Sequence, residues 1–289
     1  MRFATTKSGQ KGPSRRAPAC ETRRRRRSFS GTGCLKRSLG AGYPVRIICL
    51  LVIGLVGGAP AVQGNHSEAA LKAFLQAQLE FKKQAHDSQA AWQFGRACFD
   101  LADYATNSAE RAAIAGQGIE ACRQSVARDS NSAPGHYYLG LNLGQLARTR
   151  DMGALKLVDD MEREFIRAIE LDGGFDYAGP ERSLALLYRD APAIISIGSR
   201  SKARRYLQRA LQIAPQYPDN RLVLIESCLK WGDRSGAARE LKTLDEAWPK
   251  AKADFAGPAW ATSWADWAER REQARKKLDA LARQDTQRH

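Results

Sequence analysis

The chain has 289 residues and a formal net charge of +15, and that charge is distributed unevenly along it. Residues 1–64 hold 13 Lys/Arg and one acid, whereas residues 65–289 hold 33 Lys/Arg and 30 Asp/Glu. The first part therefore carries +12 and the second only +3. So small an excess provides no basic track for phosphates, and we expect no nucleic-acid partner.

The amino-terminal part divides into a basic leader and a predicted signal peptide. Residues 1–44 are rich in arginine, and we expect them to be disordered or to precede the true translation start near Val45. Residues 45–64 contain an apolar run at 47–58, preceded by Arg46 and followed by small residues. Because a membrane-spanning helix needs about 20 residues, this shorter run suits a signal-peptide core. A buried helix is the alternative.

Residues 65–289 are predicted to form one all-α domain, because apolar residues recur every three or four positions and no run alternates with period two. The first stripe precedes the repeats and is expected to cap the fold. It consists of Leu71, Phe74, Leu75 and Leu79. A second stripe follows the repeats and is expected to cap the other end. It consists of Trp260, Trp264, Trp267, Leu278 and Leu281.

Between the caps we predict four helical hairpins, of which the last is the most regular. Its apolar positions are Leu224, Ile225 and Cys228 on one arm and Ala237, Leu241 and Leu244 on the other. Gly232 and Asp233 separate the arms, and Pro249 is expected to close the unit. This is the spacing of a tetratricopeptide repeat, a helical hairpin that stacks on its neighbours because it cannot bury its own apolar face.

The three earlier hairpins follow the same pattern with insertions. Their apolar and small residues are Trp92, Phe99, Gly118 and Cys122 in the first; Leu139, Gly140, Leu143, Phe165 and Ala168 in the second; and Leu184, Ala185, Tyr188, Ala203, Leu207 and Ala210 in the third. The third has three isoleucines in the loop at 191–199. This loop either folds onto the solenoid or contacts another chain, and we expect the former. Ser199 or Ser201 is expected to cap the following helix.

No pattern of catalytic or metal-binding residues is present in the sequence. There is no nucleophile elbow, phosphate loop or dinucleotide fingerprint, and no histidine lies at a metal-binding spacing from a cysteine or another histidine. We therefore expect a non-catalytic protein without a metal or cofactor. Cys98 and Cys122 share a hairpin and could form a disulfide, but free core thiols are the favoured interpretation.

Binding is expected on the surface lined by the first helix of each hairpin. The candidates are Trp92, Arg96, Tyr137, Arg182, Arg189 and Glu226. Two arginines and a tyrosine suit a peptide carboxylate or another acidic ligand. Alternatively, Arg182 and Arg189 pair with nearby acids such as Glu181 and Asp190.

Several segments resemble the T-component family of TRAP transporters, which are periplasmic tetratricopeptide proteins. The residues that carry the resemblance are Trp92, 95–97, 135–139, 178–182, Leu187, Tyr188, Ala191, Pro192, 196–199, Lys202, Ala203, Pro215, Pro218 and 220–222. The resemblance implies an accessory protein that associates with a periplasmic substrate-binding protein and forms a homo-oligomer. The chain departs from the family in having no lipoprotein signal.

The function expected from these observations is that of an exported helical-repeat protein that binds a partner protein. The destination is the periplasm or another part of the cell envelope, with membrane attachment only through an uncleaved signal segment. A general scaffold for envelope assembly and a periplasmic protein that binds a small ligand are the alternatives.

Overall fold

The computed structural model describes residues 60–150 and 153–286. The predicted leader at 1–44 and nearly all of the predicted signal peptide at 45–64 lie outside these residues. Among the described residues, no helix combines the length and the apolar composition needed to span a membrane.

The described residues form ten α-helices and no strand, which confirms the predicted all-α class. The helices are α1 (Pro60–Lys83), α2 (Ser88–Ala102), α3 (Ser108–Arg128), α4 (Ala133–Ala147), α5 (Ala154–Asp172), α6 (Phe175–Asp190), α7 (Arg200–Ile213), α8 (Pro218–Lys230), α9 (Arg234–Asp254) and α10 (Ala261–Thr286). A single 3₁₀ turn, Pro258–Trp260, precedes α10.

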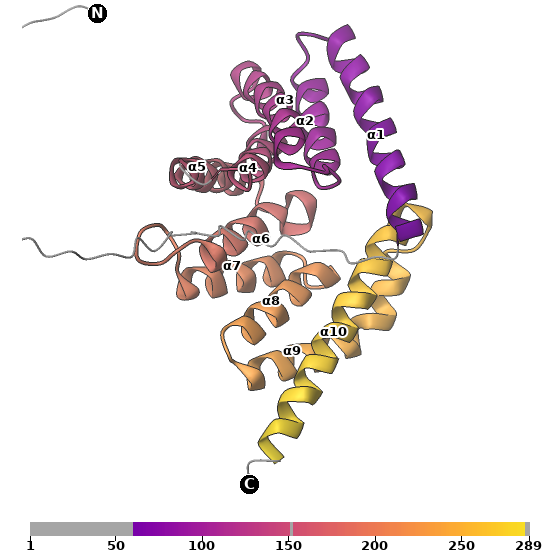
Figure 1. The fold of residues 1–289 in the computed structure, drawn as a ribbon, viewed down its shortest axis with the longest axis vertical. Coiled ribbons are helices and arrows are strands. Elements are labelled where there is room, and N and C mark those ends of the chain that lie inside the picture. Colours follow the sequence, from indigo (N-terminus) through magenta and orange to yellow (C-terminus); the bar gives the residue numbers. More distant parts are fainter. Residues whose placement is uncertain (1–59, 151–152, 287–289) are drawn as a thin grey trace, which may run out of the picture. The chain divides into compact units, whose positions relative to one another are not determined.

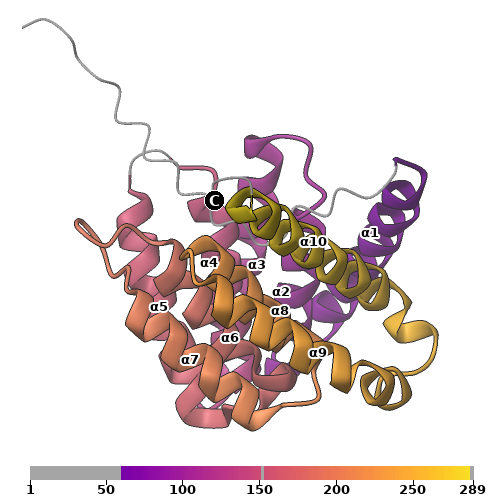
Figure 2. The same cartoon turned by 90° about the horizontal axis from the view of Figure 1, so that it is seen from below.

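Consecutive helices pack as four hairpins, α2–α3, α4–α5, α6–α7 and α8–α9 (Figure 1). The first helices α2, α4, α6 and α8 also contact one another in succession, and α10 packs against α8 and α9. The second helices α3, α5, α7 and α9 make no such contacts with each other within the described residues. The hairpins therefore lie closest together along their first helices, and Figure 2 shows the stack seen from below. We call the surface formed by α2, α4, α6 and α8 the first-helix face.

Small residues allow neighbouring helices to approach closely. A Cβ atom added at Gly118 on α3 would lie 2.2 Å from Oδ1 of Asn142 on α4. Asn142 is fully buried, and its Nδ2 donates to the backbone oxygens of Gly95 and Tyr138 at 2.9 and 2.8 Å. One buried amide thus connects α2 with α4 where α3 passes close by.

Helix α9 does not end at the predicted position. It continues through Pro249 to Asp254, so our expectation that Pro249 closes the unit is wrong. Pro249 itself is exposed, whereas Trp248, Ala251 and Phe255 are buried in the main core. We attribute the continuation to this apolar surface, which offsets the backbone hydrogen bond that a proline removes.

The loop between α6 and α7 does not fold down as expected. Ile194 is 98% exposed and Ile195 is 51% exposed, while only Ile197 packs against the core. A backbone hydrogen bond from Ser199 N to Tyr188 O at 2.8 Å closes the loop. The Ser199 hydroxyl accepts from Lys202 N at 3.3 Å and caps α7, as the sequence predicts.

The cysteines of the described part are free and buried at Cys98, Cys122 and Cys228. Burial raises the pKa of the Cys98 thiol to about 12, and burial also raises the pKa of Cys122. Neither thiol is therefore ionised near neutral pH, which is typical of cysteines that pack as small apolar residues.

Candidate functional site

A left-handed turn at the start of α6 is the most unusual backbone feature of the first-helix face. Asp176, Tyr177 and Ala178 have φ values of 50°, 54° and 64° with ψ values of 45°, 48° and 36°. Each such conformation costs an L-residue roughly 1–2 kcal/mol. Three in succession persist only where surrounding contacts hold them, and such strain is often found at functional sites.

Two buried side chains donate hydrogen bonds to the backbone of this turn. Nδ2 of Asn220, on α8, donates to the Tyr177 carbonyl at 3.1 Å and to the carbonyls of Ala210 and Ala214 at 3.2 Å each. Nη1 of Arg182 donates to the same Tyr177 carbonyl at 3.2 Å and to Oδ1 of Asn220 at 2.7 Å. The turn is therefore fixed by hydrogen bonds from inside the fold.

A chain of ion pairs runs from the left-handed turn to the C-terminal helix. Arg182 lies between Asp176 Oδ2, 3.7 Å from its Nη2, and Asp219 Oδ2, 2.9 Å from its Nε. The other Asp219 oxygen accepts from Arg270 Nη1 at 2.6 Å, and Arg270 Nε contacts Glu226 Oε1 at 2.7 Å. This alternation of charges links α6, α8 and α10.

The charges in this chain stabilise one another despite their burial. Burial opposes ionisation of Asp219, but Arg270 and Arg182 together hold the pKa of that carboxyl below its ordinary value. Arg182 is only 7% exposed and has acceptors for its guanidinium within the chain. It is therefore committed to the fold and is poorly placed to bind a carboxylate from another molecule.

Aromatic rings cover the same region in two groups. Tyr177 stacks on Tyr217 with ring centroids 4.6 Å apart, and Trp260 packs edge-on against both rings. Trp92 on α2 stacks on Tyr138 at 5.8 Å. Phe175, the first residue of α6, makes edge contacts with both rings of this second group.

Arg96 and Asp100 on α2 supply the more accessible charges. Their side chains are 59% and 51% exposed and lie 3.7 Å apart. Surrounding protein atoms remove part of the hydration of Asp100, and the nearby Asp103 and Asp176 repel its charge, so its pKa rises to about 6 although Arg96 opposes the shift. The pKa of this carboxyl therefore lies in the mildly acidic range, above that of an ordinary aspartate.

The structure brings together five of the six predicted site residues. Tyr137 donates to Asp176 Oδ2 at 3.3 Å, and Arg182 lies on the same carboxylate. The Asp176 carboxylate attracts the charged guanidinium of Arg96. Trp92 lies on α2, one turn before Arg96. Glu226 joins the set through Arg270 and Asp219.

Arg189 is separate from this set. It pairs with Asp190 at 2.7 Å, and its Nη1 lies 3.4 Å from the hydroxyl of Ser227. The sequence-based alternative that these arginines pair with acids of the chain fits the observed contacts, although Arg182 pairs with Asp219 and Asp176. Glu181 pairs instead with Arg209 at 2.8 Å.

Sequence reasoning did not identify Asp176, Tyr177, Asp219 and Asn220 as parts of one site. The segment Asp-Tyr-Ala gives little signal for three left-handed residues in succession, since only Asp176 is of a type that adopts this conformation with any frequency, and then as a single residue. The preceding Gly173 and Gly174 are the local residues that indicate an irregular backbone at this point. The interaction of Asp219 with Arg270 spans 51 residues and cannot be read from local spacing.

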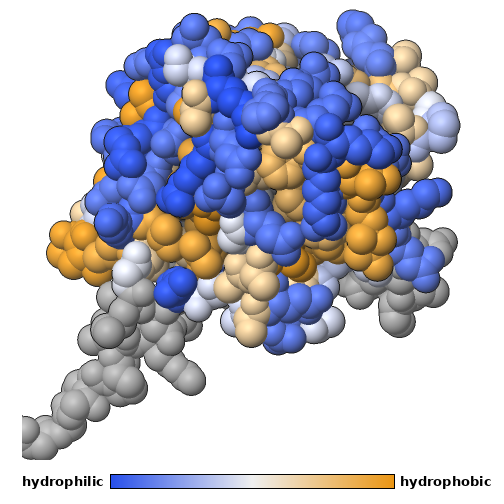
Figure 3. Space-filling view, turned by 90° about the horizontal axis from the view of Figure 1, so that it is seen from above, coloured by the Kyte–Doolittle hydropathy of each residue, from blue (hydrophilic) through white to orange (hydrophobic). Residues whose placement is uncertain are grey.

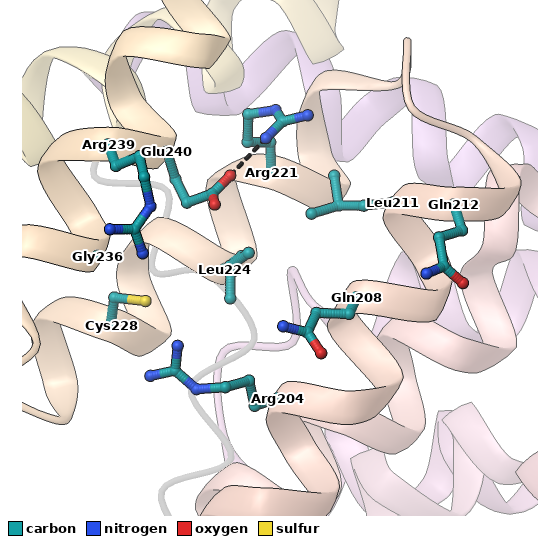
Figure 4. A pocket seen from close by; sticks show the side chains of 10 residues that line it. All are labelled: Arg204, Gln208, Leu211, Gln212, Arg221, Leu224, Cys228, Gly236, Arg239 and Glu240. Carbon is teal, nitrogen blue, oxygen red and sulfur yellow. Dashed lines mark hydrogen bonds and ion pairs between the residues drawn. The ribbon is translucent and has the colours of Figure 1, made fainter.

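A separate cavity of about 430 Å³ lies where α7, α8 and α9 meet (Figure 4). Its lining includes Arg204, Arg221, Arg239 and Glu240, with Cys228 among its apolar residues. Arg221 pairs with Glu240, and Arg204 pairs with Asp233 at 2.7 Å. Since two of its three arginines are already neutralised, this cavity is the weaker candidate for a binding site.

No group of three or more His, Cys, Asp or Glu side chains in the described part is placed to hold a metal ion. The observed geometry, stacked helical hairpins with charged and aromatic side chains on their first helices, defines a helical-repeat protein of the tetratricopeptide class.

The fold of a solved tetratricopeptide protein agrees with this class. A tetratricopeptide protein of Thermus thermophilus, TTC0263, superposes with a TM-score of 0.53 at 17% identity and covers 73% of this chain and 98% of its own. MamA matches at 18% identity with a TM-score of 0.43, over 68% of this chain and 95% of its own. A likeness at such identity concerns the fold alone.

Comparison at the level of families gives one partial match. The model of the family described as Regulator of microtubule dynamics protein 1-3 matches residues 61–174, which extend from α1 to the glycine before α6. No curated protein matches the chain.

Proposed function

We propose that this chain is a non-catalytic scaffold that binds a partner protein through its first-helix face. Proteins of the tetratricopeptide class generally mediate protein–protein interactions, which supports the coarse assignment. The observation that carries the specific proposal is the strained turn at 176–178, held by Asn220 and Arg182 next to exposed polar and aromatic side chains. Rigid placement of such groups lowers the entropic cost of binding.

The accessible parts of this face lie on α2 and at the start of α6, because α4 between them is almost entirely buried. Arg96, Asp100 and Tyr177 are exposed there, whereas α10 already packs against α8. A partner segment with both a charged group and an apolar or aromatic side chain suits this mixture. The family match covers α1 to α5, and the proposal takes from it no binding to microtubules.

The more specific form of the proposal is an exported accessory protein similar to the TRAP transporter T-component. Its support is the sequence resemblance and the predicted signal segment at 45–64. The partner is then a periplasmic substrate-binding protein. A general envelope scaffold is the alternative, and a TRAP permease encoded beside this chain would favour the accessory role.

Affinity capture from the cell envelope tests the proposal. The wild-type chain is compared with Trp92→Ala and Arg96→Glu, and with Arg123→Glu on the exposed side of α3 as a matched control. We expect the first two variants to reduce recovery of the partner at least about fivefold, while the control leaves it unchanged. Equal recovery with all four proteins would refute binding through this face.

Arg182 is unsuited to this test. Arg182→Glu would place a third acid beside Asp176 and Asp219 in a buried site, so reduced recovery would report damage to the fold.

A further inference from the structure

Helix α1 exposes a row of leucines that the other described residues leave uncovered. Leu71, Leu75 and Leu79 are 46%, 55% and 51% exposed, while Phe74 is buried against α2. The three leucines are spaced four residues apart and therefore lie along one face of the helix. The surface in Figure 3 is mostly hydrophilic with separate apolar patches.

This row is unexpected at the end of a stack of repeats. A terminal helix normally turns a polar outer face to solvent. The sequence pattern led us to expect Leu71, Leu75 and Leu79 in the apolar stripe of such a capping helix. Within the described residues, α1 packs only against α2, apart from a 3.3 Å hydrogen bond between Gln78 and Gln117 of α3. The expectation of a packed leucine stripe is therefore wrong except at Phe74.

Two opposite charges flank the row symmetrically. Glu68 and Lys82 are both exposed, and each lies seven residues from Leu75, so both share its face of the helix. The acid precedes the leucines and the base follows them. The sequence along this face therefore complements itself when a second α1 runs in the opposite direction.

We propose that the leucine row of α1 docks antiparallel against α1 of a second copy of this chain. A two-fold axis through Leu75 places Leu71 opposite Leu79 of the second copy. It also places Glu68 opposite Lys82 of the second copy, and symmetry creates each contact twice. The proposal is independent of the function proposed for the first-helix face.

The main competing occupant is the apolar run at residues 47–58. This run contains no charged residue, so it cannot pair with Glu68 and Lys82. A second α1 matches both the leucines and the flanking charges of the row.

Sedimentation equilibrium of the full chain tests the apolar part of the interface. We expect a reversible dimer whose dissociation constant rises at least tenfold in Leu75→Asp, because two leucines at the axis become aspartates. Gln76→Asp is the matched control, since Gln76 is exposed on a different side of α1, and we expect a change of less than about twofold. Circular dichroism confirms folding, which Leu75→Asp should preserve because Leu75 is already half exposed.

Charge reversal tests the direction of the two helices. Glu68→Lys and Lys82→Glu should each raise the dissociation constant about threefold to tenfold at low salt, because each replaces two attractions by two repulsions. The double variant should return to within about twofold of the wild type.

Three outcomes would overturn the proposal. One is a wild-type chain that stays monomeric up to about 100 μM. In that case hydroxyl-radical footprinting can show whether residues 47–58 cover Leu75 instead. Another is a dimer unaffected by Leu75→Asp, which would place the interface elsewhere. The third is a double charge variant that dimerises no more tightly than the single variants, which would exclude the antiparallel arrangement.

Discussion

The side chain of Asn220 joins α6, α7 and α8 through its hydrogen bonds. It is fully buried, yet its amide group is satisfied by three backbone carbonyls and by Arg182. A side chain that holds a left-handed turn, a helix end and a neighbouring arginine links local backbone strain to the packing of α6, α7 and α8. The shape of the proposed binding surface depends on this residue.

Replacement of Asn220 should therefore be costly. We expect Asn220→Ala to lower the free energy of unfolding by about 2–4 kcal/mol, because buried carbonyls lose their donor and Arg182 loses an acceptor. Urea denaturation measures the change. Asn131→Ala is the control, as Asn131 is exposed with one 3.3 Å contact to Arg167, and it should change stability by less than about 0.5 kcal/mol. Similar losses in both variants would contradict the role assigned to Asn220.

Asp100 should titrate near pH 6. Its ordinary pKa of 3.8 is raised to about 6 in the folded chain, first by loss of hydration and then by Asp103 and Asp176. Because the folded state binds the proton more tightly, Asp100 makes its full contribution to stability below about pH 4, and this contribution is lost as the pH rises through 6. The side-chain carboxyl shift in NMR measures the midpoint directly.

Arg96 provides the comparison for that titration. Its charge lowers the Asp100 pKa, so Arg96→Ala should move the midpoint upward. A wild-type midpoint below about 4.5, or a downward shift in the variant, would show that Asp100 is well hydrated and that its neighbours act only weakly.

At the scale of helices, close approach through glycine sets the packing of the first hairpins. Gly118 and Gly116 lie on the same helix but in different surroundings, since a Cβ atom at Gly118 would collide with Asn142 and one at Gly116 would meet nothing within 4 Å. The fold therefore contains its own matched pair for a test.

The two glycines should respond in opposite directions to alanine. Gly118→Ala should lower the free energy of unfolding by about 1–3 kcal/mol, because the fully buried Asn142 cannot move without losing its bonds to Gly95 and Tyr138. Gly116→Ala should raise it by about 0.5–1 kcal/mol, since alanine favours the exposed helix. Thermal and urea unfolding of both variants distinguish the cases, and a neutral Gly118→Ala would contradict the close contact.

The hairpins could be predicted because their information is local. Apolar residues such as Leu224 and Leu241 recur at helical spacing, and the residues that this spacing assigned to the core of the last hairpin are buried. The predicted end of α9 was wrong because burial of Trp248 and Phe255 outweighs the helix-breaking effect of Pro249. The predicted packing of the α1 leucines was wrong because periodicity identifies an apolar face without showing what covers it.

The candidate site was predictable only in part. Helical phase correctly brought Tyr137, Arg182 and Arg96 into one region of the fold, because first helices of successive hairpins lie side by side. It wrongly placed Tyr137 and Arg182 on the surface, since both are buried. Phase could not reveal that Arg182 is neutralised by Asp219, or that the chain adopts left-handed backbone at Asp176. Both depend on contacts between helices far apart in sequence.

At the scale of the molecule, the described residues form a stack whose two ends differ. Arg270 ties α10 to α8 through Asp219 and Glu226, so the C-terminal end is closed by ion pairs as well as by aromatic packing. At the other end α1 presents its leucine row. A scaffold with one closed end and one apolar end can bind a partner on its first-helix face while pairing with a second copy through α1.

Hydrogen–deuterium exchange on the complex recovered by affinity capture reports which helices the partner covers. We expect added protection, relative to the chain alone, in α2 and the start of α6, with little change in the second helices α3, α5 and α7. Protection confined to those second helices, or to the cavity between α7 and α9, would contradict binding through the first-helix face.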